Sequence, residues 1–252
     1  MASLTAAVTK RLPWWVNPMV VVGVLSAFGI YSLTVVLLFP GEYKDYLSPF
    51  YSPPVGKPGW LPDFITAPLF VLWIPLGFRA TCYYYRKAYY RAFFWDPPAC
   101  KAEAQDHDRP WAKSDDTYRG ERNLFVWNNV HRYFLYASFV VIAFLWYDTV
   151  LTFLPGGSFG MKVGSLLYLV NVVLLTTYSL SCHSLRHIVG GRVDCYSCVR
   201  GGNARHKAYN WLSVLNKQHA MWAWLSLFSV LFADVYMRLI AAGVIPDLTI
   251  IG

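Results

Sequence analysis

The apolar residues of this chain fall in long, nearly uninterrupted blocks, and this arrangement constrains the fold more than any other feature. Blocks of 18 or more apolar residues are typical of membrane-spanning helices. Only 14% of the 252 residues are charged, against about 25% in an ordinary soluble domain. We therefore expect one all-α domain over residues 1–252, a polytopic membrane bundle. The five expected spans are about 18–39, 62–84, 131–153, 162–187 and 219–242, and the two long polar loops are 85–130 and 188–218.

The distribution of Lys and Arg predicts how the bundle is oriented. Two of these residues lie in the N-terminal segment, ten in the stretch 79–132 and six in 186–217, which leaves four of the 22 for the other side. Because inside-facing loops are enriched in Lys and Arg, the N-terminus and both long loops are expected in the cytoplasm. The same rule explains the net charge of +8, so no nucleic-acid partner is expected. The sequence shows no evident internal repeat, low-complexity segment or secretory signal peptide.

All five cysteines and all six histidines fall on the predicted cytoplasmic side. The odd number of cysteines does not suggest a disulfide framework. Cys82 ends the second predicted span, and His131 and His219 open the third and the fifth. The densest group is Cys182-His183-x3-His187-x7-Cys195-x2-Cys198 at the end of the fourth span.

This dense group has the composition of a metal site. His183 and His187 are four residues apart and share one face of a helix. Cys195 and Cys198 have the spacing that lets two thiolates bind one metal. A turn at the glycine pair 190–191 would let the two pairs meet, giving either a tetrahedral zinc site or a Rieske-like [2Fe–2S] cluster. An inert Cys pair and interfacial histidines remain the structural alternative.

Heme b is a competing cofactor, since it needs two histidines on facing helices. His131, His183, His187 and His219 are expected near one level of the membrane, where two of them could bind a single heme. A second heme stacked towards the outer face is not expected, because the outer half of the predicted bundle has no histidine.

A further candidate site is the basic, tyrosine-rich end of the second span. Arg79, Tyr83 and Arg86 lie there at helical spacing and could shape a pocket for a quinone head. The alternative is an interfacial aromatic belt with snorkelling cations. Asp148 and Asp234 interrupt apolar runs and are candidates for function by position alone.

Five predicted spans, the segment Phe-Arg-Ala-Thr-Cys-Tyr-Tyr-Tyr-Arg (78–86) and the segment Cys-His-Ser-Leu-Arg-His (182–187) together resemble a known family. It is the single-chain membrane anchor of bacterial succinate dehydrogenases and fumarate reductases. The mycobacterial kind, whose anchor is thought to hold a membrane-embedded Rieske-type cluster, is the most similar. The resemblance covers roughly residues 14–242.

The resemblance implies a non-catalytic subunit of a succinate:quinone oxidoreductase in the bacterial cell membrane. A flavoprotein subunit would oxidise succinate, an iron–sulfur subunit would pass the electrons on, and this chain would deliver them to menaquinone or ubiquinone. The implied ligands of a [2Fe–2S] cluster near the cytoplasmic face are His183, His187, Cys195 and Cys198. Cys182 and Cys82 are rivals for the thiolate positions, and His131 and His219 for the imidazole positions.

Overall fold

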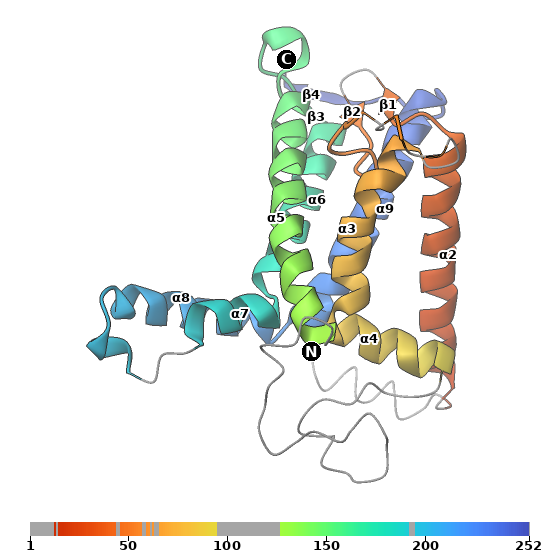
Figure 1. The fold of residues 1–252 in the computed structure, drawn as a ribbon. Helices are drawn as coiled ribbons and strands as arrows, with labels where there is room; N and C mark the ends of the chain where they lie inside the picture. The colour runs from red at the N-terminus through yellow and green to blue at the C-terminus, as the bar shows by residue number, and fades with distance from the viewer. Residues whose placement is uncertain are drawn as a thin grey trace.

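A computed structural model describes residues 13, 15–43, 46–56, 59–60, 62, 66–94, 127–191 and 195–251. The part of loop 85–130 between residues 95 and 126, with Cys100 and His107, therefore lies outside the described residues. The described chain forms a bundle of roughly parallel helices with shorter helices running across one end (Figure 1). The chain is an integral membrane protein, because four of its helices are long and apolar enough to cross a bilayer.

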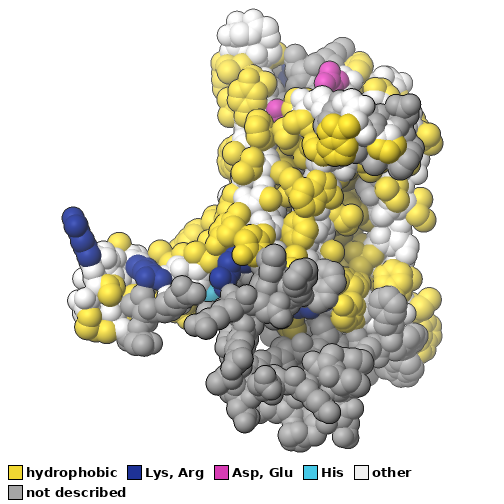
Figure 2. All heavy atoms as spheres, viewed as in Figure 1, with side chains coloured by type: hydrophobic (Ala, Val, Ile, Leu, Met, Phe, Trp, Pro, Cys, Tyr) yellow, Lys and Arg dark blue, Asp and Glu magenta, His cyan; other side chains and the backbone are white. Residues whose placement is uncertain are grey.

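The four long helices coincide with four of the expected spans. An α-helix rises 1.5 Å per residue, so even the shortest of the four, with 18 residues, is about 27 Å long, close to the ~30 Å of a bilayer core. Their apolar side chains face outward over much of the surface (Figure 2), as lipid requires. The four helices are α2 (Val16–Leu38), α5 (Trp127–Thr152), α6 (Val163–Leu180) and α9 (His219–Ala241).

The second and fourth expected spans end earlier than the sequence predicts. Instead of running to 84 and 187, α3 (Ala67–Thr81) and α6 each stop before a cysteine. Cys82 has ψ 130° and Cys182 has ψ 135°, both extended conformations that interrupt the helical hydrogen bonding. The chain then enters a new short helix, α4 (Tyr83–Tyr89) or α7 (His183–Gly190). In Figure 1, α4 and α7 leave the bundle in opposite directions at the same end, called here the cysteine end.

The chain turns back after α7, as the glycine pair predicts, and α7 and α8 (Gly202–Asn216) together form a segment called here the arm. Arg205 of α8 donates hydrogen bonds to the carbonyl oxygens of Val189 and Gly191, so α7 and α8 lie side by side (Figure 1). The other elements are η1 (Tyr90–Phe94), η2 (Pro155–Gly157), η3 (Tyr196–Cys198), the antiparallel pair β1 (Glu42–Tyr43) with β2 (Tyr46–Leu47), and the antiparallel pair β3 (Met161–Lys162) with β4 (Thr249–Ile251).

A buried ionic network holds the opposite end of the bundle together. Asp234 on α9 is fully buried and pairs with Arg238 one helical turn on, at 2.7 Å. The same carboxylate accepts hydrogen bonds from Tyr31 on α2, at 2.5 Å, and from Ser48. Because a buried charge needs partners, this network accounts for Asp234 as a residue that joins three segments.

The charges on the visible surface separate between the two ends. Figure 2 shows Lys and Arg side chains around α7 and α8 and Asp and Glu at the opposite end. The described part of the structure thus retains the charge asymmetry on which the orientation was predicted.

Candidate metal centre

Two cysteines and two histidines from separate helices meet inside the cysteine end. Cys82 and Cys182 occupy the breaks after α3 and α6, while His131 lies in the first turns of α5 and His219 begins α9. All four are buried, with exposed fractions of 1%, 1%, 6% and 2%. The Sγ of Cys82 lies 3.4 Å from Nε2 of His219, and the Sγ of Cys182 lies 3.2 Å from Nε2 of His131.

A hydroxyl group orients each histidine. Thr81 Oγ1 donates to the carbonyl of Gly77 at 2.7 Å and lies 2.8 Å from Nδ1 of His131. Because the hydroxyl proton is already used, the oxygen accepts a hydrogen bond from Nδ1–H of the imidazole. The proton on Nδ1 leaves the lone pair of Nε2 directed at the Cys182 sulfur, which is the tautomer that a metal-binding imidazole needs.

The second histidine is held in the same way. Ser181 Oγ donates to the carbonyl of Tyr178 at 2.8 Å and lies 2.7 Å from Nδ1 of His219. The hydroxyl therefore accepts from Nδ1–H, and Nε2 of His219 presents its lone pair to Cys82. Both imidazoles are thus prepared as ligands through Nε2.

Two aromatic rings complete the walls of this centre. The ring of Phe78 stacks on His131 with centroids 4.7 Å apart, and that of Tyr178 stacks on His219 with centroids 5.0 Å apart. Phe78 and Tyr178 contact each other, at 5.2 Å between centroids. The four rings form one continuous aromatic unit around the buried thiols.

These residues belong to a short repeat that was not predicted from the sequence. The pattern aromatic-x2-(Thr/Ser)-Cys-x3-Arg occurs at 78–86 and again at 178–186. In both copies the Cys amide bonds to the carbonyl three residues earlier, and the Arg amide bonds to the Cys carbonyl. A histidine at the start of a later helix, on α5 or α9, completes each half. The repeated Ser/Thr-Cys pair was the available signal, but the long insertions between the pairs and the histidines hide it.

The donor set fits a cluster with two metal ions. Two thiols and two imidazoles are the ligands of a Rieske-type [2Fe–2S] centre. Burial raises the pKa of the Cys182 thiol to about 12, so a bound cation is needed to hold it as a thiolate at neutral pH. Among the described residues, no three His, Cys, Asp or Glu side chains converge as ligands of one ion; the four donors come as two Cys–His pairs.

The first-choice ligands from the sequence are not brought together as a set of four. Cys195 and Cys198 are exposed and bonded to each other in a disulfide, which leaves neither sulfur as a thiolate. His183 and His187 are exposed on α7, with their Nε2 atoms 3.0 Å apart. The four side chains that do meet are the rivals Cys82, Cys182, His131 and His219, as their positions at four helix ends allow.

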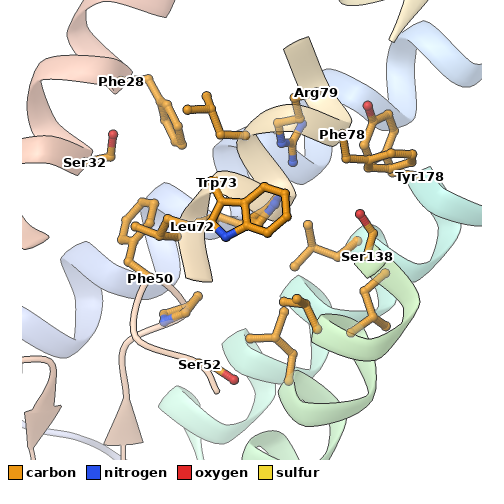
Figure 3. Close-up of a pocket in the computed structure, with 18 of the residues that line it drawn as sticks. Phe28, Ser32, Phe50, Ser52, Leu72, Trp73, Phe78, Arg79, Ser138 and Tyr178 are labelled. Carbon is orange, nitrogen blue, oxygen red and sulfur yellow. The ribbon is translucent and has the colours of Figure 1, made fainter. Parts of the chain in front are cut away.

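A cavity of about 370 Å³ adjoins the centre from inside the bundle. Phe78 and Tyr178, which stack on the two histidines, also line this cavity (Figure 3). Arg79 lines it too and holds its position through hydrogen bonds to the Ala223 carbonyl and to Ser226, both at 3.0 Å. Most of the remaining lining is apolar, including Phe28, Leu72, Trp73 and Val141.

The predicted quinone residues are only partly associated with this cavity. Arg79 lines it, but Tyr83 and Arg86 are not among its lining residues. Arg86 is buried in α4 close enough to His131 for an electrostatic interaction, and Tyr83 packs edge-on against Tyr84. The break at Cys82 separates Arg79 from the other two, so the regular helical face on which the three were grouped does not exist. Asp148 bonds to Ser52, which lines the far end of the cavity.

Comparisons with known proteins identify the family of this chain. Residues 16–243 match the family described as actinobacterial succinate dehydrogenase subunit SdhC. A chain of the solved "Mycobacterium smegmatis Sdh1 complex in the apo form" is similar with a TM-score of 0.76 and 36% sequence identity, over 96% of this chain and 93% of that one. No protein with a curated description matches significantly. With a family match over nearly its whole length, this chain belongs to the actinobacterial succinate dehydrogenase subunit SdhC family, the membrane anchors of succinate dehydrogenase.

Proposed function

We propose that this anchor passes electrons to a membrane quinone through a Rieske-like [2Fe–2S] cluster held by Cys82, Cys182, His131 and His219. The observation that supports this best is the pair of hydroxyl groups that set both histidines as Nε2 donors facing buried thiols. A cluster of this kind supplies a one-electron carrier. Cys82 and Cys182 would hold it as thiolates, and His131 and His219 would hold it through Nε2.

In this proposal the protein provides a short route for electrons from the cluster to the quinone. Phe78 and Tyr178 separate the histidines from the cavity. A quinone ring at the Arg79 end would therefore lie one aromatic side chain away from each imidazole. The guanidinium of Arg79 would stabilise the negative charge that develops on a quinone oxygen during reduction, and the apolar lining would exclude water.

The wider arrangement follows from the family and the charge asymmetry. A flavoprotein and an iron–sulfur subunit would dock at the cysteine end, which would face the cytoplasm of a bacterium. Electrons would then arrive close to the four ligands. With 15 residues, α3 is about 22 Å long, and it runs within the bundle beside α5. We infer that it is the fifth span.

The test is the low-temperature electron paramagnetic resonance (EPR) spectrum of the dithionite-reduced complex. A Rieske-type signal is expected, with iron and acid-labile sulfide in equal amounts. A complex with fully occupied soluble clusters and no such signal would disprove the proposal.

Heme b and zinc remain the alternatives to separate by experiment. A bis-histidine heme could use His131 and His219, but it would leave two buried cysteines without a role. A b-type α-band in the reduced-minus-oxidised optical spectrum would favour heme. Zinc without additional iron in the purified complex would favour a structural site.

A further inference from the structure

The two copies of the repeat differ in the aromatic ring that stacks on the histidine. Where the first copy has Phe78, the second has Tyr178, and both rings stack on a histidine. The difference is a phenolic hydroxyl on one side of an otherwise matched pair of ligands.

This hydroxyl is buried and has no ordinary partner. Tyr178 is 1% exposed, and its oxygen lacks a protein hydrogen-bond partner of normal geometry in the described structure. The Cys82 thiol, which belongs to the same buried cluster of side chains, is close enough to the Tyr178 hydroxyl for a weak hydrogen bond. A buried hydroxyl without a full hydrogen bond costs about 1–3 kcal/mol, so the Cys82 sulfur is the acceptor expected at this point.

A cation lies against the ring of Tyr178. The guanidinium of Arg79 lies over the ring, 4.9 Å from its centroid. A cation in this position is attracted to the electron-rich face of the ring and holds the phenol in place. Arg79 has no counterpart in the second copy, where Ser179 follows Tyr178.

On the basis of the proposed cluster, we infer that Tyr178 donates a hydrogen bond to a sulfur of that centre, on the side of Cys82, and raises its reduction potential. A hydrogen bond to sulfur stabilises the reduced cluster, which carries one more negative charge, more than the oxidised cluster. Tyr178 is thus a tuning residue rather than a ligand. It sets how readily the centre accepts an electron from its donor.

The experiment is a redox titration of the EPR signal in the whole complex carrying Tyr178→Phe. Removing the hydroxyl should make reduction of the cluster about tenfold less favourable, a fall of ~59 mV in the midpoint potential for a one-electron couple. The intensity of the signal should not change. Replacement of Tyr178 by 3-fluorotyrosine keeps the side chain in place and makes its hydroxyl a stronger donor, so the potential should rise.

Tyr168→Phe provides a matched control. Tyr168 is on the same helix, is 3% exposed and also has a buried hydroxyl without a hydrogen bond, but it packs against Tyr46 towards the opposite end. Its variant should leave the potential unchanged. Full signals with the same potential in the unaltered, Tyr178→Phe and fluorotyrosine complexes overturn the inference. Absence of the signal from the unaltered complex would overturn the proposed function instead.

Discussion

The two halves of the bundle, one containing α3 and the other α6, hold their cysteines in the same way. In one half α3 ends at Thr81 and Cys82 follows, and in the other α6 is followed by Ser181 and Cys182. In each half the hydroxyl beside the cysteine orients a histidine, and that histidine faces the cysteine of the other half. Neither half contains a complete Cys–His contact. The centre therefore exists only when the halves are packed together.

The halves differ where the centre meets its surroundings. The first contributes Arg79 to the cavity and continues into α4, while the second contributes Tyr178 and continues into the arm of α7 and α8. Asn216 at the end of α8 bonds to the Ser181 carbonyl at 2.8 Å, so the arm is fastened to the second break. The shared features bind the cofactor, in our interpretation, and the unshared ones control its potential and its access to quinone.

The largest predicted effect is loss of the cluster from either half. Cys82→Ser and Cys182→Ser should each abolish the Rieske-type EPR signal and the quinone-reduction activity, because each removes one of the two thiolate ligands of the proposed cluster. Equal loss in the two variants would show that both halves are required.

Cys198→Ser is the control for these two substitutions. Cys198 is also a cysteine, but it is exposed in the arm and bonded to Cys195 in a disulfide, so the variant should retain the signal and the activity. Loss of the signal in this variant, with retention in Cys82→Ser, would support the first-choice ligands from the sequence instead. These are His183, His187, Cys195 and Cys198.

The next effect concerns the hydroxyl groups. Thr81→Val and Ser181→Ala remove the acceptors for the Nδ1 protons, and loss of such an outer partner typically costs roughly 10–100-fold in metal affinity or activity. Iron retained per complex after mild chelation measures the loss. Thr81→Ser keeps the hydroxyl and should retain iron. If Thr81→Val retained iron as well, orientation of His131 by this hydroxyl would be unnecessary.

The sequence predicts the bundle well because lipid imposes a pattern that can be read locally. Each long helix must be apolar over about twenty residues, and four expected spans agree with α2, α5, α6 and α9 within a few residues at most ends. The breaks at Cys82 and Cys182 were missed, since neither cysteine is followed by Pro or Gly. Their extended conformations depend on packing at the cysteine end.

The candidate centre could not be located from how closely Cys and His residues follow one another in the sequence. His183, His187, Cys195 and Cys198 are close in sequence, but a run of neighbouring donors on an exposed arm need not converge. The donors that meet come from helix ends separated by 51 and 137 residues. These helix ends lie at the same end of the bundle. The predicted spans and the distribution of Lys and Arg had already placed all four residues on one side of the membrane.

The smallest predicted effect tests whether quinone binds in the cavity, without disturbing the cluster to which both halves contribute ligands. Ser138 on α5 is 4% exposed, lines the cavity and has no side-chain hydrogen-bond partner among the described residues. Ser138→Phe would fill part of the cavity and weaken quinone binding there. A loss of about 1.4 kcal/mol in binding free energy corresponds to a roughly tenfold rise in the KM for quinone, with the EPR signal intact. Val140→Phe, two residues away and 59% exposed, is the matched control and should leave KM unchanged. An unaltered KM in Ser138→Phe would mean that quinone is reduced outside this cavity, and the two halves would then share the cofactor but not the substrate site.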